Sequence, residues 1–179
     1  MIMKLDELKQ FVTTNDSDLV LTAKLSALET IIRSYTNNRF HAKPLIRIEA
    51  FVRGGVFLSD ALIPFTVGDT VQITKGDKAE DLGLYTVKEI TDDTTFTVNE
   101  PIADMDDIKV TKVSYDMNIK MGVVNMLRWE AVNGDKLGIQ SETISRHSVT
   151  YADANGENYL MGYPKSLLGF LKPYVKARF

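Results

Sequence analysis

The feature that most limits the possible folds of this chain is a change in hydrophobic period, from helical to alternating and back again. Before residue 44 the apolar residues recur every three or four positions, and from 45 to 115 they alternate singly with polar residues. From residue 116 onward the helical spacing returns. This order predicts an α+β fold, in which a helical core formed by 1–44 and 116–179 carries an inserted β module at 45–115.

The helix near the N-terminus has the clearest pattern. Asn15, Asp16 and Ser17 can cap its start, and the Asn37-Asn38 pair suits a left-handed C-cap. One apolar stripe runs between these caps at helical spacing: Leu21, Leu25, Leu28, Ile32 and Tyr35. The opposite side is predicted to carry Thr22, Ser26, Glu29 and Arg33. A shorter helix is predicted before it, from the apolar residues Leu5, Leu8, Phe11 and Val12.

The inserted segment reads as five or six short strands separated by turn residues. Its first strand shows strict alternation, and Gly54-Gly55 suits a two-residue hairpin turn. Regular short strands of this kind predict a small antiparallel barrel or sandwich. Tyr85 and Phe96 are expected in its core.

A third helix is predicted from a cap at Asp116 to a stop at Gly134. Its apolar residues cover most of the helix circumference, which predicts burial on nearly every side. Self-association of the chain is the natural way to cover so much apolar surface. The alternative is an unusually central core helix.

The C-terminal stretch combines a strand pattern with a short apolar helix. The segment Ser148 to Ala152 reads as a strand and Asn155-Gly156 as a turn, together a strand or hairpin. Pro164 suits the first turn of the following helix, and Pro173 is expected to end it.

Composition excludes several classes of function. With 179 residues, no cysteine and two histidines, the chain has no disulfide, no thiol chemistry and no sequence-local metal site. A net charge of −3 gives no global attraction to nucleic acid. The longest apolar runs are too short to cross a bilayer, and the N-terminus lacks the layout of a signal peptide, so no membrane association is expected.

Charge is distributed unevenly along the chain. The segment 69–107 has a balance of −8, whereas 161–179 has a balance of +4 and contains no acid. One interpretation is two solvated surfaces of opposite sign. The other is that the acidic module stays off nucleic acid while the basic end docks on a partner.

The sequence contains no recognisable catalytic or cofactor motif. The acids Asp92, Asp93, Asp104, Asp106 and Asp107 occupy predicted turns without the glycine and terminal glutamate of a calcium loop. The serines near His147 lack a nucleophile elbow, and the glycines form no phosphate-binding loop. We therefore expect no enzyme activity, no cofactor and no metal.

Three segments in this order resemble the adaptor, or head completion, proteins of tailed-phage head–tail connectors. They are DLVLTAKLSALETIIRSYTNNRF, GIQSETISRHSVTYA and GYPKSLLGFLKPYVK, and the β block GDTVQITKG is similar to insertions in some of those proteins. The β module at 45–115 departs from the many short, nearly all-helical members of that family.

The resemblance implies a small helical-bundle core and a structural role in the virion, in a protein made in the host bacterial cytoplasm. It also implies a ring, typically twelvefold, that contacts the portal protein and the next connector or tail-completion protein. Genome DNA would pass through its channel without sequence-specific binding.

The predicted contact residues are aromatic, apolar or basic, and aromatic anchors with arginine are the usual carriers of interface energy. They are Met121, Trp129, Tyr163, Leu168, Phe170, Leu171, Lys172, Tyr174, Lys176 and Arg178. For Leu168 and Leu171 the alternative is intramolecular core packing. The alternative function is a small nucleic-acid-binding module or regulator that uses the inserted barrel, as such folds bind single strands.

Overall fold

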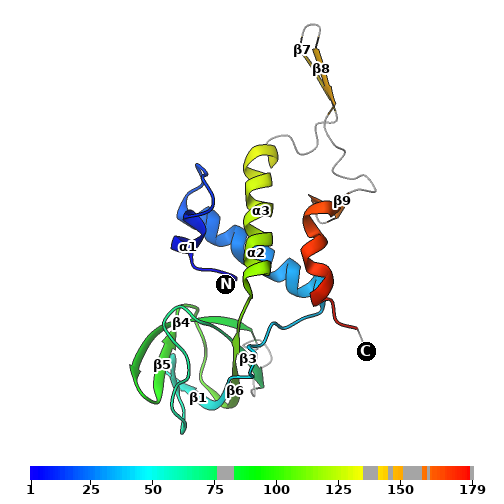
Figure 1. Ribbon diagram of the computed structural model, residues 1–179. Helices are drawn as coiled ribbons and strands as arrows, with labels where there is room; N and C mark the ends of the chain where they lie inside the picture. The colour runs from blue at the N-terminus through cyan, green and yellow to red at the C-terminus, as the bar shows by residue number, and fades with distance from the viewer. Residues whose placement is uncertain (76–82, 135–140, 145–146, 151–158, 161, 178–179) are drawn as a thin grey trace. The chain divides into compact units, whose positions relative to one another are not determined.

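The computed structural model divides into two compact units (Figure 1). It describes residues 1–75, 83–134, 141–144, 147–150, 159–160 and 162–177. Unit 1 contains Met1–Ile2 and Arg39–Tyr115, and unit 2 contains Met3–Asn38 and Asp116–Phe179. The barrel unit is therefore inserted in sequence between the two parts of the helical unit.

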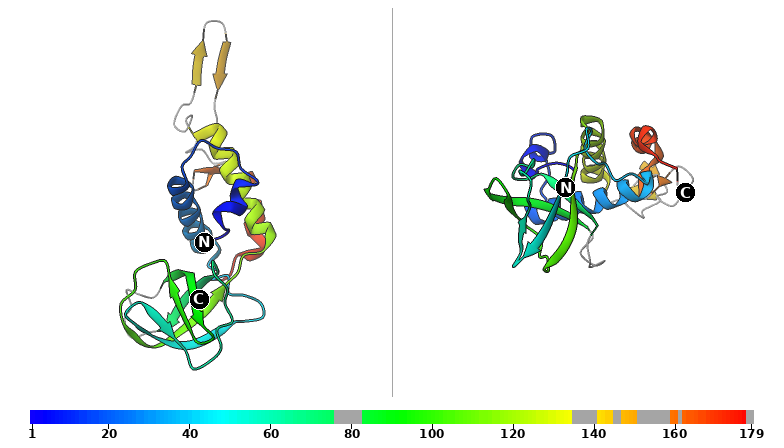
Figure 2. Two further views of the ribbon diagram at one scale, coloured as in Figure 1. Left: turned by 90° about the vertical axis from the view of Figure 1, so that its left-hand side faces the viewer. Right: turned by 90° about the horizontal axis from the view of Figure 1, so that it is seen from below.

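Unit 1 is a closed antiparallel barrel of six strands, with the neighbour order β1-β2-β5-β4-β3-β6. The strands are β1 (Arg47–Arg53), β2 (Val56–Leu58), β3 (Thr70–Lys75), β4 (Leu84–Asp92), β5 (Thr95–Val98) and β6 (Met105–Val113). In both views of Figure 2 these strands curve around a common interior. The prediction of a mixed helix-and-strand fold with an antiparallel barrel is confirmed.

Alternation along the strands fills the barrel. In β1 every second residue is buried, beginning at Ile48. Phe57 and Phe96 are fully buried, with stacked rings whose centroids lie 4.5 Å apart, and Tyr85 is also buried, so the predicted core aromatics are in place. Gly54 and Gly55 join β1 to β2 with φ values of 58° and 80°, the left-handed conformation that this hairpin turn requires.

Unit 2 begins with α1 (Leu5–Lys9) and α2 (Asp18–Thr36). The Ser17 side chain accepts a hydrogen bond from the Val20 N–H and caps α2, and Asn37 ends it in the left-handed conformation, as predicted. Leu21, Leu25, Leu28 and Ile32 are buried. Two predictions for α2 were wrong: Glu29 is buried and Tyr35 is exposed, because the buried stripe continues from Leu28 through Glu29 and Ile32 to Thr36.

The third helix, α3 (Met117–Asn133), is capped by the Asp116 side chain, which accepts from the Ile119 N–H. Burial on nearly every side was predicted, and this is wrong. Its buried side is formed by Ile119, Gly122, Val123, Val124, Met126 and Leu127. The other side is exposed and includes Met117, Asn125, Arg128 and Val132. Unit 2 therefore covers α3 without a second copy, except along this strip.

The C-terminal part contains two short antiparallel pairs and a helix. β7 (Ser141–Ile144) pairs with β8 (His147–Thr150), and β9 (Tyr159–Leu160) pairs with β10 (Tyr163–Pro164). The strand predicted around residues 148–152 is thus confirmed up to Thr150, whereas the predicted Asn155-Gly156 turn lies outside the described residues.

The final helix, η3 (Lys165–Tyr174), is a 3-10 helix that packs against α3 and α2. Pro173 lies inside its last turn, one residue before the helix ends at Tyr174, so the stop predicted at Pro173 falls one residue early. Helices account for about 36% of the chain, and a helical-bundle core stays a prediction. Within the described part, no helix has both the length and the apolar character needed to cross a bilayer.

Candidate interaction surfaces

The predicted contact residues of η3 divide between the core and the surface. Leu168 and Leu171 are 4% and 0% exposed, so they pack inside unit 2, which is the intramolecular alternative that their pattern left open. Phe170 is half-buried and its ring lies directly on the backbone of α3 at Gly122. A β-carbon on residue 122 would lie 2.5 Å from Phe170 Cδ2, so this close approach requires glycine.

Tyr174 ties the end of η3 to the start of α3. Its hydroxyl donates to Asp116 Oδ2 at 2.6 Å and accepts from Asn118 Nδ2 at 3.2 Å. Burial and the Asp116 carboxylate raise the pKa of Tyr174 above its ordinary value. Asp116 thus caps α3 with one oxygen and holds the C-terminal segment with the other.

The residues after η3 bind the C-terminal end of α2. The Lys176 N–H donates to the Thr36 carbonyl at 2.8 Å, and the Asn37 side chain donates to the Ala177 carbonyl at 2.8 Å. The Asn38 side chain donates to the Tyr174 carbonyl at 3.1 Å. These bonds satisfy backbone groups at the end of α2 and of the tail. The backbone of the C-terminal segment is therefore part of unit 2.

Trp129 and Tyr163 belong to an aromatic corner on α3. The Trp129 ring lies 5.7 Å from the Tyr163 ring and 6.2 Å from that of Tyr159. The Tyr163 hydroxyl donates to Glu130 Oε2 at 2.7 Å, and burial together with this carboxylate raises the pKa of Tyr163. Glu130 also pairs with Lys24 of α2 at 2.9 Å. The corner thus links β9 and β10 to two helices.

A hollow of about 580 Å³ lies beside Lys24 and is lined by polar groups of the α1–α2 connection. Lys24 Nζ lies between Asp16 Oδ2 at 2.7 Å and Glu130 Oε1 at 2.9 Å. The hydrogen bond with Asp16 raises the pKa of Lys24 and lowers that of Asp16. Both carboxylates that line the hollow, Asp16 and Glu130, are therefore already paired with the Lys24 ammonium, and these ion pairs stabilise the fold.

Two of the remaining predicted contact residues, Lys172 and Lys176, keep their side chains at the surface. Lys172 and Lys176 are exposed and form no ion pair within the described ranges, and Val175 between them is 51% exposed. Met121 is half-buried on α3. Arg178 lies outside the described residues. The C-terminal segment therefore turns its leucines inward and its lysines outward.

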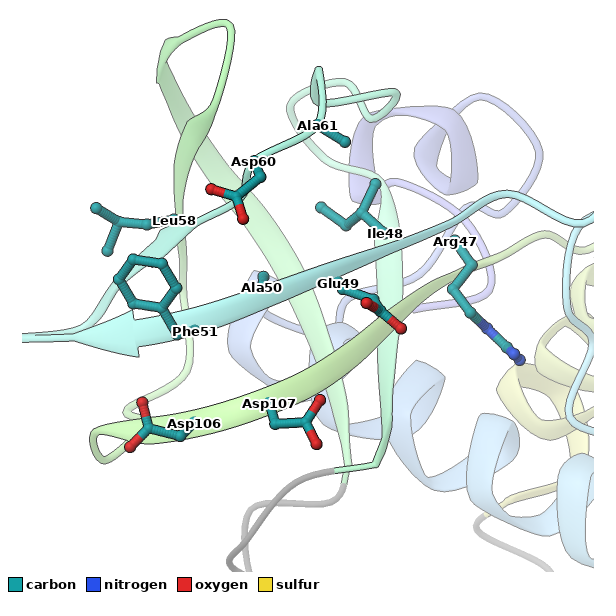
Figure 3. A pocket seen from close by; sticks show the side chains of 10 residues that line it. All are labelled: Arg47, Ile48, Glu49, Ala50, Phe51, Leu58, Asp60, Ala61, Asp106 and Asp107. Carbon is teal, nitrogen blue, oxygen red and sulfur yellow. The ribbon is translucent and has the colours of Figure 1, made fainter.

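An open groove of about 510 Å³ runs along the outer face of the barrel (Figure 3). Its exposed apolar surface comes from Phe51, Leu58 and Ala61, and Phe51 is 37% exposed, while Ala50, which also lines the groove, is buried. Its other lining residues are Arg47, Ile48, Glu49, Asp60, Asp106 and Asp107. Figure 3 shows Asp60 on one side of β1 and the two β6 aspartates on the other.

The charges of the groove are mostly in exposed ion pairs. Asp106 pairs with Arg53 and Asp107 with Lys75, while Glu49 pairs with Lys109 at 3.2 Å. Asp60 has no hydrogen bond or ion pair to another of the described residues. Exposed pairs of this kind are weak and can rearrange around a ligand. The groove therefore suits a positively charged group with an apolar stem.

Sequence reasoning did not find this groove. The outward positions of β1 could be read from its alternation, since Glu49 and Phe51 are both outward residues. The residues that lie beside Glu49 and Phe51 in the groove could not be predicted in this way. Asp60 follows β2 and Asp106 belongs to β6, and only the closed order of strands brings them beside β1.

The described residues contain no group of three or more histidine, cysteine or acidic side chains that could hold a metal ion. The turn prediction was wrong for three of the acids, because Asp92 is the last residue of β4 and Asp106 and Asp107 lie in β6. Asp104 accepts from the Gly54 N–H, and Asp92 accepts from the Thr94 N–H and hydroxyl. His41 Nε2 lies 3.1 Å from Gln72 Oε1. These contacts stabilise turns and strands of the barrel.

No protein-family model and no curated protein matches this chain.

Proposed function

We propose that the chain is a non-enzymatic structural component of a tailed-phage head–tail interface. In this proposal it assembles as a ring below the portal, around the DNA channel, and contacts the portal protein and the next connector or tail-completion protein. It would be made in the host bacterial cytoplasm and reside in the virion. The helical unit would supply a small bundle core, and the barrel would be an insertion within it.

One observation carries the proposal. The helical segments that resemble connector proteins correspond to α2 and η3, and both lie in unit 2 with α3, while the barrel occupies a separate unit. Segments far apart in the sequence therefore form one body: η3 packs on α3 and α2, and the tail bonds to the end of α2. This grouping is what an adaptor core with a β insertion requires.

A second feature favours assembly. From Leu19 to Tyr35, none of the exposed residues of α2 is charged, and Leu19 is 81% exposed. The exposed hydroxyls of Thr22 and Thr30 donate to carbonyls of their own helix at 2.8 and 3.1 Å. A neighbour could cover this face without burying a charge or leaving these hydroxyls unpaired. A solvated helix of this length ordinarily carries charges on its outer face.

The alternative of a nucleic-acid-binding barrel has less support. Four basic residues of unit 1 are held in ion pairs with acids: Arg53, Lys75, Lys109 and Lys112. Binding to a nucleic acid backbone through these four residues would compete with their ion pairs. Absence of binding to single- or double-stranded DNA and RNA by the intact chain at low salt would remove this alternative.

Removing the gene from the phage genome that encodes it tests the proposal. The expected result is DNA-filled heads without tails in electron micrographs, restored to tailed particles by a plasmid copy of the gene. The Gly169→Ala variant serves as a complementation control, because a β-carbon there has open space around it. Normal tailed particles without the gene would refute the proposed function.

A further inference from the structure

We propose that the acidic groove on the barrel of one copy receives the C-terminal segment Lys172–Lys176 of a second copy. The inference deepens the proposed function by naming a contact between copies, and it rests on that function only for the choice of a second copy as partner. The groove consists of an apolar surface between carboxylates, and the segment consists of an apolar residue between two cations.

The groove provides the chemistry that recognises a lysine. The ring of Phe51 is 37% exposed, and the Arg53 guanidinium lies 5.5 Å from its centroid, so the ring already carries one cation and the rest of its exposed surface offers apolar contact. Asp60 lies on one side and Asp106 and Asp107 on the other (Figure 3). Asp60 has no partner among the described side chains, and a cation placed beside it would form a new ion pair without breaking an old one.

The C-terminal segment carries the matching features. Val175 is 51% exposed and lies between the exposed Lys172 and Lys176. The Lys176 N–H is bonded to the Thr36 carbonyl, which fixes the backbone while leaving both ammonium groups outside. A segment held in one conformation loses little entropy when it binds. Seated in the groove, Val175 would cover the exposed Phe51 ring while the two lysines face the carboxylates.

A contact between two different surfaces of the same chain is heterologous, and repeated contacts of this kind close into a ring or continue as a filament. The proposed contact therefore provides the type of interface that a ring component needs. Because its charged groups are exposed, the contact is expected to weaken as ionic strength rises.

Disulfide trapping tests the contact, since the chain has no cysteine of its own. Ala61→Cys places a thiol at the groove and Val175→Cys places one on the segment, and both positions are exposed. Each chain carries one thiol, so every disulfide joins two copies. The matched control is Leu62→Cys mixed with Val132→Cys, because these residues are 72% and 70% exposed and Leu62 does not line the groove.

We expect the Ala61→Cys and Val175→Cys chains, once mixed, to form the mixed disulfide faster than either homodimer and faster than the control pair. Adding Asp60→Lys to the groove chain should slow it roughly threefold to tenfold, the effect of one or two exposed ion pairs. Adding Lys172→Glu to the partner chain should then restore the rate. Added salt should slow the unsubstituted pair.

Mixed disulfide formation no faster than in the control pair, or insensitive to both charge reversals, would overturn the proposal. If particle assembly depends on Asp60 while the two thiols show no preference, the groove binds a basic segment of another protein and the second-copy contact is refuted. Conversely, preferential pairing combined with normal tailed particles after gene removal would leave the contact standing and refute only the proposed function.

Discussion

The contact between Gly122 and Phe170 gives a quantitative test of how the C-terminal segment is held. In Gly122→Ala the new β-carbon would lie 2.5 Å from Phe170 Cδ2, whereas ordinary contacts lie at 3.4–4 Å. The ring must therefore shift by about 1 Å, or rotate outward and lose buried area. Overpacking of this kind costs about 1–3 kcal/mol. Alanine in a helix interior recovers about 0.8–1 kcal/mol relative to glycine, so we expect a net destabilisation of up to about 2 kcal/mol.

The double-mutant cycle separates the clash from the helix propensity. In a Phe170→Ala background the ring is absent, and Gly122→Ala should then stabilise the helical unit by about 1 kcal/mol. The control is Gly169→Ala, where a β-carbon meets no atom within 4 Å, and it should change stability by less than about 0.5 kcal/mol.

Urea denaturation followed by tryptophan fluorescence measures these free energies, because Trp129 is the single tryptophan of the chain and lies in unit 2. Far-UV circular dichroism recorded in parallel shows whether the barrel unfolds in the same transition. The same change in stability for Gly122→Ala in both backgrounds would refute the proposed packing of η3 on α3.

Three further predictions concern stability. Burial would raise the pKa of Asp69, but its contacts with Lys112 and the Thr66 N–H outweigh burial and lower this pKa. The contribution of Asp69 to the free energy of unfolding is therefore full above the unfolded pKa of about 3.9 and is lost as pH falls. Asp69→Asn should cost about 1 kcal/mol at pH 7 in urea titrations and should reduce the loss of stability at acidic pH. Tyr163→Phe should cost about 1–2 kcal/mol of unfolding free energy near neutral pH, measured by tryptophan fluorescence. Because the folded pKa of Tyr163 is raised, the stability that its hydroxyl contributes is full below about pH 10 and is lost above it. Gly55→Ala should cost about 1 kcal/mol or more by circular dichroism, because residue 55 has a φ of 80°, and an unchanged midpoint would contradict that strain.

The parts of the fold that could be predicted from the sequence are those set by neighbouring residues. The caps at Ser17 and Asp116, the left-handed Asn37 and the Gly54-Gly55 turn each use bonds or dihedral angles within a few residues. Alternation along the strands likewise gave the inward face of the barrel. These local preferences agree with the final structure, as expected when each level of organisation favours the same fold.

The parts that could not be predicted depend on residues far apart in the chain. An apolar residue on a short helix has the same pattern whether it meets its own core or another protein, so Leu168 and Leu171 could not be assigned from spacing alone. The buried Glu29 breaks the apolar pattern of α2. The bond from Lys176 to Thr36 joins positions that no local motif connects. For the same reason, the groove could not be predicted from the sequence, because its lining residues come together only in the closed barrel.

The structure also changes how the role of the C-terminal segment must be tested. Deleting 173–179 removes the Tyr174 hydroxyl from Asp116 and the tail from the end of α2, so the loss of two or more hydrogen bonds would destabilise unit 2 by roughly 1–3 kcal/mol. A truncated chain that fails to assemble could therefore fail by unfolding. Lys172→Glu and Lys176→Glu change only outward ammonium groups and leave those bonds intact, so they test docking without altering the fold. If these variants unfold at the wild-type urea concentration but assemble poorly, docking depends on the cations; if they assemble normally, the segment serves only to hold unit 2 together.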